Sequence, residues 1–363
     1  MPVEFNAFDR TAMARALELA ERGLATTHPN PRVGCVIARA GRIVGEGWHE
    51  RAGEAHAEVM ALGAAGAAAA GASAYVTLEP CSHFGRTPPC ADALIQARIA
   101  RVVFAIEDPN PGVGGAGALR LRDAGIEVES GLMAREAEEL NVGYLSRMRR
   151  HRPWVRIKLA MSLDGRTALA NGKSRWITGE AARADVQRWR ARSSAVLTGI
   201  GTVLADDPRL DVRAGTVRDQ PLRVVLDSRL RMPPDARILA RPGEVLLFST
   251  SDEPARRSAL ELQGAKVERL AQARPDLGQV VARLAELEIN EVMVEAGPTL
   301  AGAFVQAGLV DELLLYIAPL LLGPQARALL QLPELTDLAQ GSRFIMMDTC
   351  AVGPDLRLRL RPA

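Results

Sequence analysis

Apolar and polar residues alternate along the first 150 residues in short blocks of helical and strand-like spacing. Helical spacing runs from Asp9, a typical helix cap, to about Leu24. A hairpin is predicted next, from strands at 33–38 and 43–47 around a turn at Gly41. Later blocks predict a helix from 56, a strand at 74–78, a helix from 90, a strand at 102–106, a helix at 119–124 and a strand at 127–129. This alternation predicts an α/β sandwich.

The second half of the chain shows the same alternation. Strands are predicted at 154–160, 195–199, 223–227, 244–248, 292–295, 312–317 and 356–361, and helices at 179–192, 279–287 and 298–308. Helices between successive strands indicate a mostly parallel sheet. The two halves share no internal repeat, so the pattern predicts a second, different α/β domain.

A basic segment, Arg147–Pro153, separates the two patterns. It is polar and closed by a proline, and a basic run this short is more often a solvated linker than a binding site. The chain has 363 residues, which is enough for two domains. We therefore predict a first domain at 1–151 and a second domain at 152–363.

Charge narrows the classes of function. The chain carries 45 basic and 43 acidic residues, a formal net charge of +2. A general nucleic-acid binder usually has a strong basic excess, so this class is disfavoured, although a local basic patch stays open. A hydrophobic fraction of 48% is normal for a soluble globular protein. We expect small-molecule substrates rather than nucleic-acid partners.

Neither a targeting segment nor a disulfide framework is visible in the sequence. No basic start followed by an apolar run opens the chain, and the longest apolar stretch, 313–323, is shorter than the ~20 residues that span a bilayer. We therefore expect a cytoplasmic protein without a membrane partner. Four cysteines are too few for a disulfide framework in a chain of this length. Cys35 and Cys350 are predicted to be core residues because of their apolar neighbours.

The other two cysteines belong to a candidate metal site. His56, Cys81 and Cys90 supply one imidazole and two thiolates, a zinc set that leaves a fourth position for water. His-x-Glu, completed here by Glu58, followed by Pro-Cys is typical of zinc-dependent nucleobase deaminases. Thiolate ligands indicate a reducing compartment. A helix beginning at Cys90 is expected to lower the pKa of its thiol.

Three interpretations of this site stay open. In a catalytic site, zinc activates a water, and Glu58 takes its proton and returns it to the nitrogen that leaves a pyrimidine-like ring as ammonia. In a structural clip, His83 closes the site as a fourth ligand. Glu58 favours the catalytic interpretation, because a clip gives it no reason to lie beside His56. An RNA-editing deaminase is disfavoured by the near-zero net charge.

Polar residues near these motifs are candidates for substrate binding. Asn30 could recognise the ring, and His49, His83 and Arg86 could contact the ring or an attached phosphate. Each of the four could equally be a loop residue with a local hydrogen bond. Glu79 could support the metal site or simply cap its loop.

Together these motifs resemble the RibD family of bifunctional riboflavin biosynthesis enzymes. In the first half the resemblance is carried by THPNP at 27–31, GEAHAE at 53–58, YVTLEPCSH at 75–83, GRTPPC at 85–90 and DPNP at 108–111. In the second half it is carried by SLDGR at 162–166, WIT at 176–178, TVLADDP at 202–208 and VEAGPTLAG at 294–302. The eight residues between Cys81 and Cys90 are the family's own version of the motif.

The resemblance implies a fold and two reactions. The expected fold is an N-terminal cytidine-deaminase-like α/β/α sandwich followed by a C-terminal dihydrofolate-reductase-like α/β domain. The first domain is expected to deaminate 2,5-diamino-6-ribosylamino-4(3H)-pyrimidinone 5′-phosphate with one Zn²⁺ per chain. The second is expected to reduce the ribosyl chain of the product to ribityl with NADPH. We also expect a homo-oligomer.

The resemblance also assigns residues of the second half. Expected cofactor contacts are Ala160, Trp176, Thr202, Asp206, Ser228, Gly297, Pro298, Thr299, Leu300, Ala301, Gly302 and Ala303. Expected substrate contacts are Ser174, Arg190, Leu210, Arg213 and Glu295, beside Asn30, His49 and Arg86 in the first half.

The residues by themselves say less about the second half. The strand at 292–295 is followed by a turn of small residues and the start of a helix. This pattern is equally consistent with a phosphate-binding site at the helix N-terminus and with ordinary packing. No G-x-G-x-x-G is present, so a common dinucleotide-binding fold is not indicated. Arg190 and Arg213 suit a sugar phosphate, but lone arginines usually form surface salt bridges. All five histidines lie in the first 151 residues, so a proton in the second half must come from water or a carboxylate, and Asp206 is the candidate.

Overall fold

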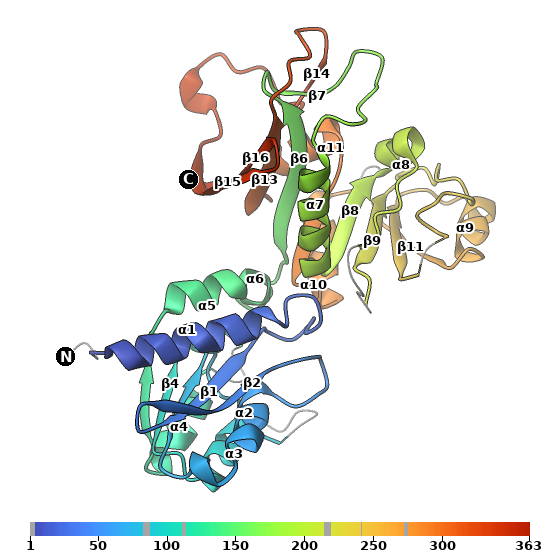
Figure 1. The fold of residues 1–363 in the computed structure, drawn as a ribbon. Coiled ribbons are helices and arrows are strands. Elements are labelled where there is room, and N and C mark those ends of the chain that lie inside the picture. The colour runs from blue at the N-terminus through green and yellow to red at the C-terminus, as the bar shows by residue number, and fades with distance from the viewer. Residues whose placement is uncertain (1–3, 83–87, 111–113, 214–218, 241, 272–274) are drawn as a thin grey trace. The chain divides into compact units, whose positions relative to one another are not determined.

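The computed structural model describes residues 4–82, 88–110, 114–213, 219–240, 242–271 and 275–363 (Figure 1). The chain forms two compact units, and the boundary falls between His151 and Arg152. We call them the N-terminal and C-terminal units. The basic segment lies at this boundary and its residues 149–151 are exposed, but it is not an irregular linker throughout. Its first four residues end helix α6 (Val142–Arg150), and Arg152 binds Asp311 through bonds of 2.6 and 3.0 Å.

The N-terminal unit is built on a five-stranded sheet with the order β2-β1-β3-β4-β5. Its strands are β1 (Gly34–Arg39), β2 (Arg42–Trp48), β3 (Ser73–Val76), β4 (Arg101–Phe104) and β5 (Glu127–Ser130). β1 pairs antiparallel with β2 and β3, whereas β3, β4 and β5 run parallel. The predicted hairpin is confirmed, and the other predicted strands differ only at their ends.

Helices cover both faces of this sheet, which confirms the predicted α/β sandwich (Figure 1). One face carries α1 (Ala7–Glu21), α5 (Ala134–Leu140) and α6, and the other carries α2 (Ala57–Ala65), α3 (Cys90–Gln96) and α4 (Ala116–Asp123); a short 3-10 turn, Gly66–Ala69, follows α2. Successive strand residues point to opposite faces. Val36 therefore packs on the α1 side, and Cys35 and Ile37 pack on the α2 side.

Local sequence fixes where two of these helices lie. The cap of α1 is Asn6 rather than the predicted Asp9, because each side chain accepts the other's backbone N–H in a capping box. Gly45 and Gly47 on β2 face the backbone of α2. A Cβ at Gly45 would lie 2.3 Å from the carbonyl oxygen of Ala61, so only glycine lets α2 lie directly on this strand. The position of the N-terminus of α2 follows from this close approach.

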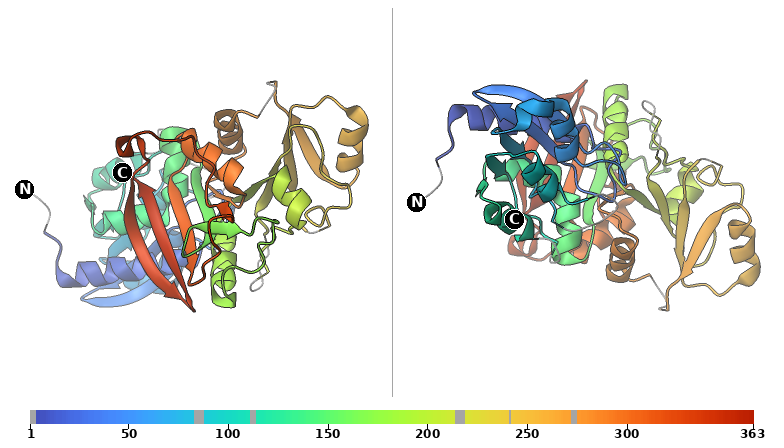
Figure 2. Two further views of the ribbon diagram at one scale, coloured as in Figure 1. Left: turned by 90° about the horizontal axis from the view of Figure 1, so that it is seen from above. Right: turned by 90° about the horizontal axis from the view of Figure 1, so that it is seen from below.

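The C-terminal unit is built on a nine-stranded sheet with the order β11-β10-β9-β8-β12-β6-β13-β16-β15. Its strands are β6 (Trp154–Ser162), β8 (Ala195–Gly199), β9 (Leu222–Leu226), β10 (Val245–Ser249), β11 (Ala265–Arg269), β12 (Glu291–Val294), β13 (Glu312–Ala318), β15 (Phe344–Val352) and β16 (Asp355–Pro362). The first seven strands in this order are parallel, as predicted, and β16 and β15 pair antiparallel. Figure 2 shows β10–β11 and β15–β16 at opposite ends of the sheet.

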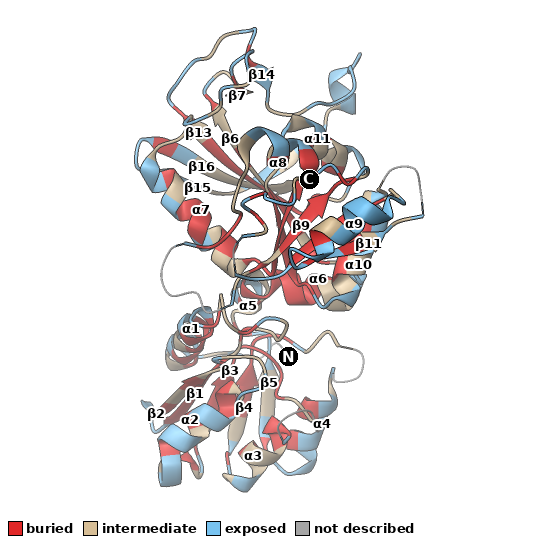
Figure 3. Ribbon diagram, turned by 90° about the vertical axis from the view of Figure 1, so that its right-hand side faces the viewer, coloured by how far each residue is buried: buried red, intermediate tan, exposed pale blue. Residues whose placement is uncertain are grey.

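Helices also cover both faces of this larger sheet. One face carries α10 (Leu277–Glu286) and α11 (Pro298–Gln306), and the other carries α7 (Glu180–Arg192), α8 (Ile200–Asp206) and α9 (Pro254–Glu261). Two short strands, β7 (Arg166–Ala168) and β14 (Arg327–Ala328), form a separate ribbon, and a 3-10 turn spans Leu338–Gln340. Figure 3 shows that buried residues concentrate in the central strands.

The two cysteines outside the candidate metal site differ in burial. Cys35 is fully buried, as predicted, but Cys350 is exposed on β15, so its prediction as a core residue is wrong. β15 is an edge strand with exposed residues along its length, and apolar neighbours therefore do not indicate burial there.

No helix in the described part of the chain combines the length and apolar character needed to cross a bilayer.

Candidate active sites

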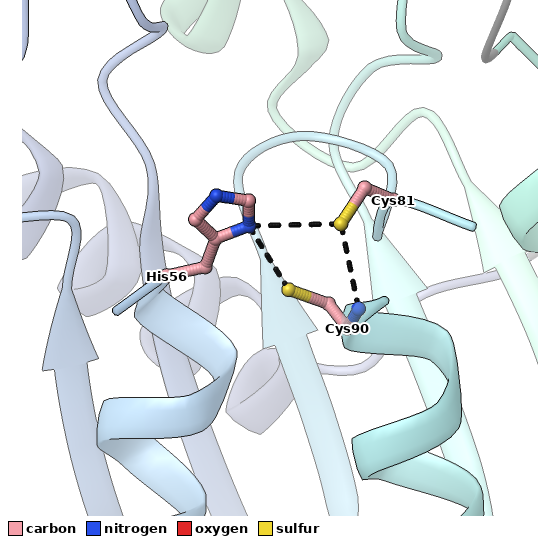
Figure 4. A group of neighbouring side chains, drawn as sticks. All are labelled: His56, Cys81 and Cys90. Carbon is pink, nitrogen blue, oxygen red and sulfur yellow. Dashed lines mark hydrogen bonds between the residues drawn. The ribbon is translucent and has the colours of Figure 1, made fainter. Parts of the chain in front are cut away.

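Three side chains from separate segments of the N-terminal unit point toward one another (Figure 4). His56 is the N-cap of α2, Cys81 follows β3, and Cys90 is the first residue of α3. Nδ1 of His56 lies 3.2 Å from Sγ of Cys90 and 3.6 Å from Sγ of Cys81. Two residues of a helix that are two positions apart lie on different faces. His56 has extended backbone angles and lies outside the helix, so this rule does not separate its side chain from that of Glu58.

The geometry of this group fits a zinc ion. Its three ligand atoms all lie within 4.8 Å of one another. A tetrahedral zinc with Zn–N near 2.0 Å and Zn–S near 2.3 Å places its ligand atoms about 3.5–3.8 Å apart. The two distances from His56 are close to that range. Among the described residues, the group consists of these three ligands, and His83, the fourth ligand of the structural-clip interpretation, lies outside the described part of the chain.

The two thiols have opposite pKa shifts. Hydrogen bonds from Cys90 and His56 lower the pKa of Cys81 to about 4, and the backbone N–H of Cys90 donates to the same sulfur at 3.4 Å. The bond to Cys81 and burial raise the pKa of Cys90. The expectation that the helix N-terminus lowers the pKa of Cys90 is therefore wrong, since two close thiols do not lose their protons independently. Cys81 is the readily ionised thiol of the pair.

Glu58 lies beside this group in the first turn of α2. It is 3% exposed, and burial raises the pKa of its carboxyl to about 7, while the charge of His56 acts in the opposite direction. A carboxyl that titrates near neutral pH can both accept and return a proton. The environment of Glu58 is therefore that of a general base and acid.

The remaining candidates in this unit have different positions. Asn30 and His49 lie next to each other, with Nδ2 of Asn30 3.0 Å from Nε2 of His49. The ring of His49 packs edge-on against that of His56, with ring centroids 5.3 Å apart. Glu79 accepts the backbone N–H groups of Asp108, Gly115 and Ala118, so it caps the loop before α4. His83 and Arg86 lie outside the described residues.

A second polar cluster lies in the C-terminal unit, on the α7 side of the sheet. Arg190 on α7 donates to both carboxylate oxygens of Glu295, at 2.5 and 2.8 Å, and to the carbonyl oxygen of Asp211 at 3.1 Å. Burial opposes ionisation of Glu295, but the charges of Arg190 and Lys158 lower its pKa overall. The prediction that Arg190 forms a surface salt bridge, made from the residue alone, is wrong because this pair is largely buried.

Lys158 is the residue of this cluster that sequence analysis missed. Burial lowers the pKa of its ammonium group, Glu295 raises it, and Arg190 lowers it further. Its Nζ lies 5.9 Å from the centre of the Tyr316 ring. The sequence carried one signal, since Lys158 is one of three lysines in the chain and lies between Ile157 and Leu159 in the middle of a strand.

Comparison with known proteins decides the family. Residues 6–106 match the cytidine and deoxycytidylate deaminase zinc-binding region, and residues 153–358 match the RibD C-terminal domain. The chain is 53% identical to the riboflavin biosynthesis protein RibD of Escherichia coli, over 97% of this chain and 99% of that protein. The RibD of Bacillus amyloliquefaciens is 44% identical over 96% of this chain and 95% of its own length.

This chain belongs to the RibD family. The solved structure of Acinetobacter baumannii RibD, form 1, superposes with a TM-score of 0.92 at 48% identity, covering 98% of this chain and 99% of that one. The family's fold is therefore confirmed for both units, a cytidine-deaminase-like domain and a dihydrofolate-reductase-like domain. As a RibD, the chain is a bifunctional deaminase and reductase of riboflavin biosynthesis.

The RibD resemblance placed cofactor contacts along α11, and the structure separates them into two groups. Gly297, Pro298 and Thr299 form the N-terminus of the helix, where no side chain caps the first amides and a Cβ on Gly297 would meet nothing within 4 Å. Such an open N-terminus fits a phosphate. Ala301 is fully buried, and a Cβ at Gly302 would lie 2.2 Å from the carbonyl oxygen of Gln331. These two positions therefore pack against protein.

The other expected RibD contacts lie around the ends of the parallel strands. Ala160 is on β6, Thr202 and Asp206 are on α8, and Ser228 follows β9. Trp176 is 68% exposed, with the Arg183 guanidinium 4.6 Å from its ring centroid. Ser174 precedes it in the same loop. Leu210 is buried, whereas the side chain of Arg213 is 54% exposed and its Nε lies 3.6 Å from Asp211.

Proposed function

We propose that the N-terminal unit removes an exocyclic amine from 2,5-diamino-6-ribosylamino-4(3H)-pyrimidinone 5′-phosphate by hydrolysis. The observation that carries this proposal is a buried Glu58, with its pKa raised to about 7, beside the group of His56, Cys81 and Cys90. A solved structure from Thermotoga maritima, 33% identical with a TM-score of 0.88, is named a diaminohydroxyphosphoribosylaminopyrimidine deaminase/5-amino-6-(5-phosphoribosylamino)uracil reductase. That name supports the substrate.

His56, Cys81 and Cys90 would hold one Zn²⁺, which supplies a Lewis acid that activates water at neutral pH. Glu58 accepts a proton from the attacking water and returns it to the amine nitrogen, which leaves as ammonia. The carboxyl begins and ends this cycle in the same state, so no other acid is required. The thiolate ligands favour a reducing compartment, and we therefore propose a cytoplasmic location.

We propose that the C-terminal unit reduces the ribosyl chain of the deaminated product with NADPH. The first amides of α11 fit a phosphate of the cofactor, which would supply the hydride. Reduction of the ring-opened sugar also requires a proton. Lys158 is a better donor than the expected Asp206, because it lies in the buried cluster with Glu295, whereas Asp206 is 41% exposed and faces Arg175 at 3.8 Å.

The two arginines of this site have different roles in the proposal. Arg190 already donates to Glu295 and Asp211, so it fixes the carboxylate of Glu295 in place. Arg213 is exposed, and its backbone N–H donates to Gln187, which fixes the start of its side chain. We assign the substrate phosphate to Arg213, because its exposed guanidinium, whose Nε lies 3.6 Å from Asp211, can bind a phosphate with two parallel bonds.

The experiment that tests the proposed function follows both reactions in one solution. The chain is loaded with zinc and incubated with the phosphoribosylated diaminopyrimidinone and NADPH. We expect ammonia release, NADPH oxidation and a product whose mass corresponds to a ribitylamino-uracil phosphate. Ammonia release without NADPH oxidation, in the presence of excess cofactor, would contradict the reductase proposal, and the converse would contradict the deaminase proposal. Size-exclusion chromatography tests the expected homo-oligomer.

A further inference from the structure

Asn30, a candidate for recognition of the substrate ring, lies in the segment 22–33 between α1 and β1. Prolines stand on both sides of it, at 29 and 31. A proline has no backbone N–H, so neither neighbour of Asn30 can donate a backbone hydrogen bond that would fix the segment. Asn30 nevertheless contacts His49, whose ring packs against that of the metal-site residue His56. The position of Asn30 therefore depends on contacts that other segments make with this one.

One side chain, Asn141 at the junction of α5 and α6, bonds to this segment twice. Its Oδ1 accepts the backbone N–H of Arg32 at 2.8 Å, and its Nδ2 donates to the carbonyl oxygen of Arg32 at 2.9 Å. These are the two bonds that a residue of a neighbouring antiparallel strand would make. Both residues are buried, with Asn141 only 1% exposed, so the two bonds are shielded from water.

The side chain of Asn141 makes this pair instead of capping its own helix. Asn141 is the N-cap residue of α6, a position at which an asparagine side chain normally accepts an N–H of the first helical turn. No side-chain bond caps α6, because the amide of Asn141 is turned toward Arg32. The orientation of Asn141 therefore stabilises the segment around Arg32 rather than the end of α6.

Two further hydrogen bonds join the same helices to the segment. The guanidinium of Arg32 donates to the carbonyl oxygen of Leu140, the last residue of α5, at 2.8 Å. On α6, the guanidinium of Arg147 donates to the carbonyl oxygen of Pro29 at 3.2 Å. Pro29 directly precedes Asn30, and Arg32 follows it by two positions. The segment is thus held by α5 and α6 on both sides of Asn30.

We infer that Asn141, together with Arg147, is a positioning residue of the deaminase that holds Asn30 in place for the substrate ring. Both residues lie outside the span 6–106 that matches the deaminase zinc-binding region, and no site residue was expected in α5 or α6. The inference rests on the proposed deaminase function. It assigns to α6 an effect on the reaction that passes through Asn30.

A double-mutant cycle separates this positioning role from a general effect on the fold. It compares zinc-loaded wild type, Asn141→Ala, Asn30→Ala and the double variant, and measures kcat/KM for ammonia release from the phosphoribosylated diaminopyrimidinone. We expect Asn141→Ala to lower kcat/KM about 10-fold while Asn30 is present. In the Asn30→Ala background the same change should alter kcat/KM less than about twofold, because the group that Asn141 positions is gone.

A second cycle uses Arg147→Met, and it decides the question if circular dichroism shows that Asn141→Ala does not fold. Methionine keeps the length of this half-buried side chain but removes the donor to Pro29. We expect kcat/KM for ammonia release to fall about fivefold, again only while Asn30 is present. NADPH oxidation with the deaminated intermediate should be unchanged in every variant, because it uses the other unit.

The control for lost stability is Tyr75→Phe, which removes a buried hydrogen bond of 2.7 Å from Tyr75 to Asp9 in the same unit. It should lower the melting temperature, keep about one zinc per chain and leave kcat/KM at the wild-type value. A loss of kcat/KM in Tyr75→Phe as large as that in Asn141→Ala would overturn the inference, because any lost buried bond would then have the same effect.

The cycles give a clear contradiction. Equal falls of kcat/KM in the two backgrounds, or wild-type kinetics in Asn141→Ala, would overturn the inference while the deaminase function stands. Wild-type kinetics in Asn30→Ala would do the same, since there would be no group to position. If wild type itself releases no ammonia from this substrate, the proposed deaminase function fails and this inference fails with it.

Discussion

Asn30 and His49 form a hydrogen bond whose direction the structure determines. Nδ1 of His49 lies 3.1 Å from the carbonyl oxygen of Ala55, and since a carbonyl only accepts, Nδ1 carries the proton. Burial lowers the pKa of His49 and so favours its neutral form. Nε2 therefore accepts the N–H of Asn30 at 3.0 Å. The amide oxygen of Asn30 is then the atom that can accept a hydrogen bond from an N–H of the substrate ring.

Replacing Asn30 with Asp tests this arrangement. A carboxylate cannot donate to Nε2 of His49, so one buried acceptor loses its partner, at about 1–3 kcal/mol. We expect kcat/KM for ammonia release to fall about 10- to 100-fold. NADPH oxidation with the deaminated intermediate should be unchanged, because it uses the other unit. Wild-type deaminase kinetics in Asn30→Asp would remove Asn30 from the site.

Zinc content tests the metal site. We expect Cys81→Ser to lose bound zinc and ammonia release together, because a serine hydroxyl is not deprotonated at neutral pH and is a poor zinc ligand. Cys350→Ser is the matched control, since this cysteine is exposed on a strand of the other unit. Metal analysis after dialysis should give about one zinc per chain for wild type and for the control. Full zinc content in Cys81→Ser would contradict the assignment of Cys81 as a ligand.

The spacing of apolar residues predicted the fold wherever a strand or helix buries one face. The hairpin, the parallel sheet of the C-terminal unit and α7 were all visible, because their apolar residues recur at strand or helix spacing. The sequence analysis missed the helices α5, α6, α8 and α9 and the strands β7, β11, β14 and β15. β15 is exposed on both faces along most of its length, so alternation gives no signal there. The cap of α1 was misplaced by three residues, because Asn6 and Asp9 cap each other.

The active sites were predictable where spacing alone defines the chemistry. His56, Glu58, Cys81 and Cys90 follow a compact motif, and the structure brings them together. Lys158 was missed because its partner Glu295 is distant in sequence, and only the pairing of β12 with β6 brings the two strands together. Tertiary contacts of this kind leave no local pattern.

Arg190→Lys tests the role assigned to the bidentate pair. Lysine keeps the charge but cannot bind both oxygens of Glu295, so that carboxylate loses its fixed position. We expect NADPH oxidation with the deaminated intermediate to fall about 10- to 100-fold, while ammonia release is unchanged. The control is Arg188→Lys on the same helix, whose side chain is 76% exposed. Equal reductase activity in the two variants would contradict the positioning role of Arg190.

The pH dependence of stability tests a buried charge network in the C-terminal unit. Glu312 is fully buried and accepts from Arg156 at 2.6 Å and from Arg359 at 2.8 Å. Burial alone would raise the pKa of Glu312, but the arginines lower it to about 2. A depressed pKa contributes stability above the ordinary value near 4.5, and this contribution is lost as pH falls from there toward 2.

Glu312→Gln should remove that dependence. We expect the free energy of unfolding of wild type to lose about 3 kcal/mol from this group between pH 4.5 and 2. The variant should be less stable at pH 7 by about 3–5 kcal/mol, because Arg156 loses one of its two buried partners. Trp189 fluorescence during urea unfolding reports the change, since its ring lies 4.5 Å from the Arg156 guanidinium. The exposed Glu286→Gln is the control.

The most direct test of two sites acting in series uses Glu58→Gln. Wild type should release ammonia from the phosphoribosylated diaminopyrimidinone and then oxidise NADPH. The variant should do neither with this substrate, because it lacks the proton carrier of the first site, yet it should oxidise NADPH at the wild-type rate when given the deaminated intermediate. Ammonia release by the variant at the wild-type rate, or failure to oxidise NADPH with the intermediate, would contradict the account.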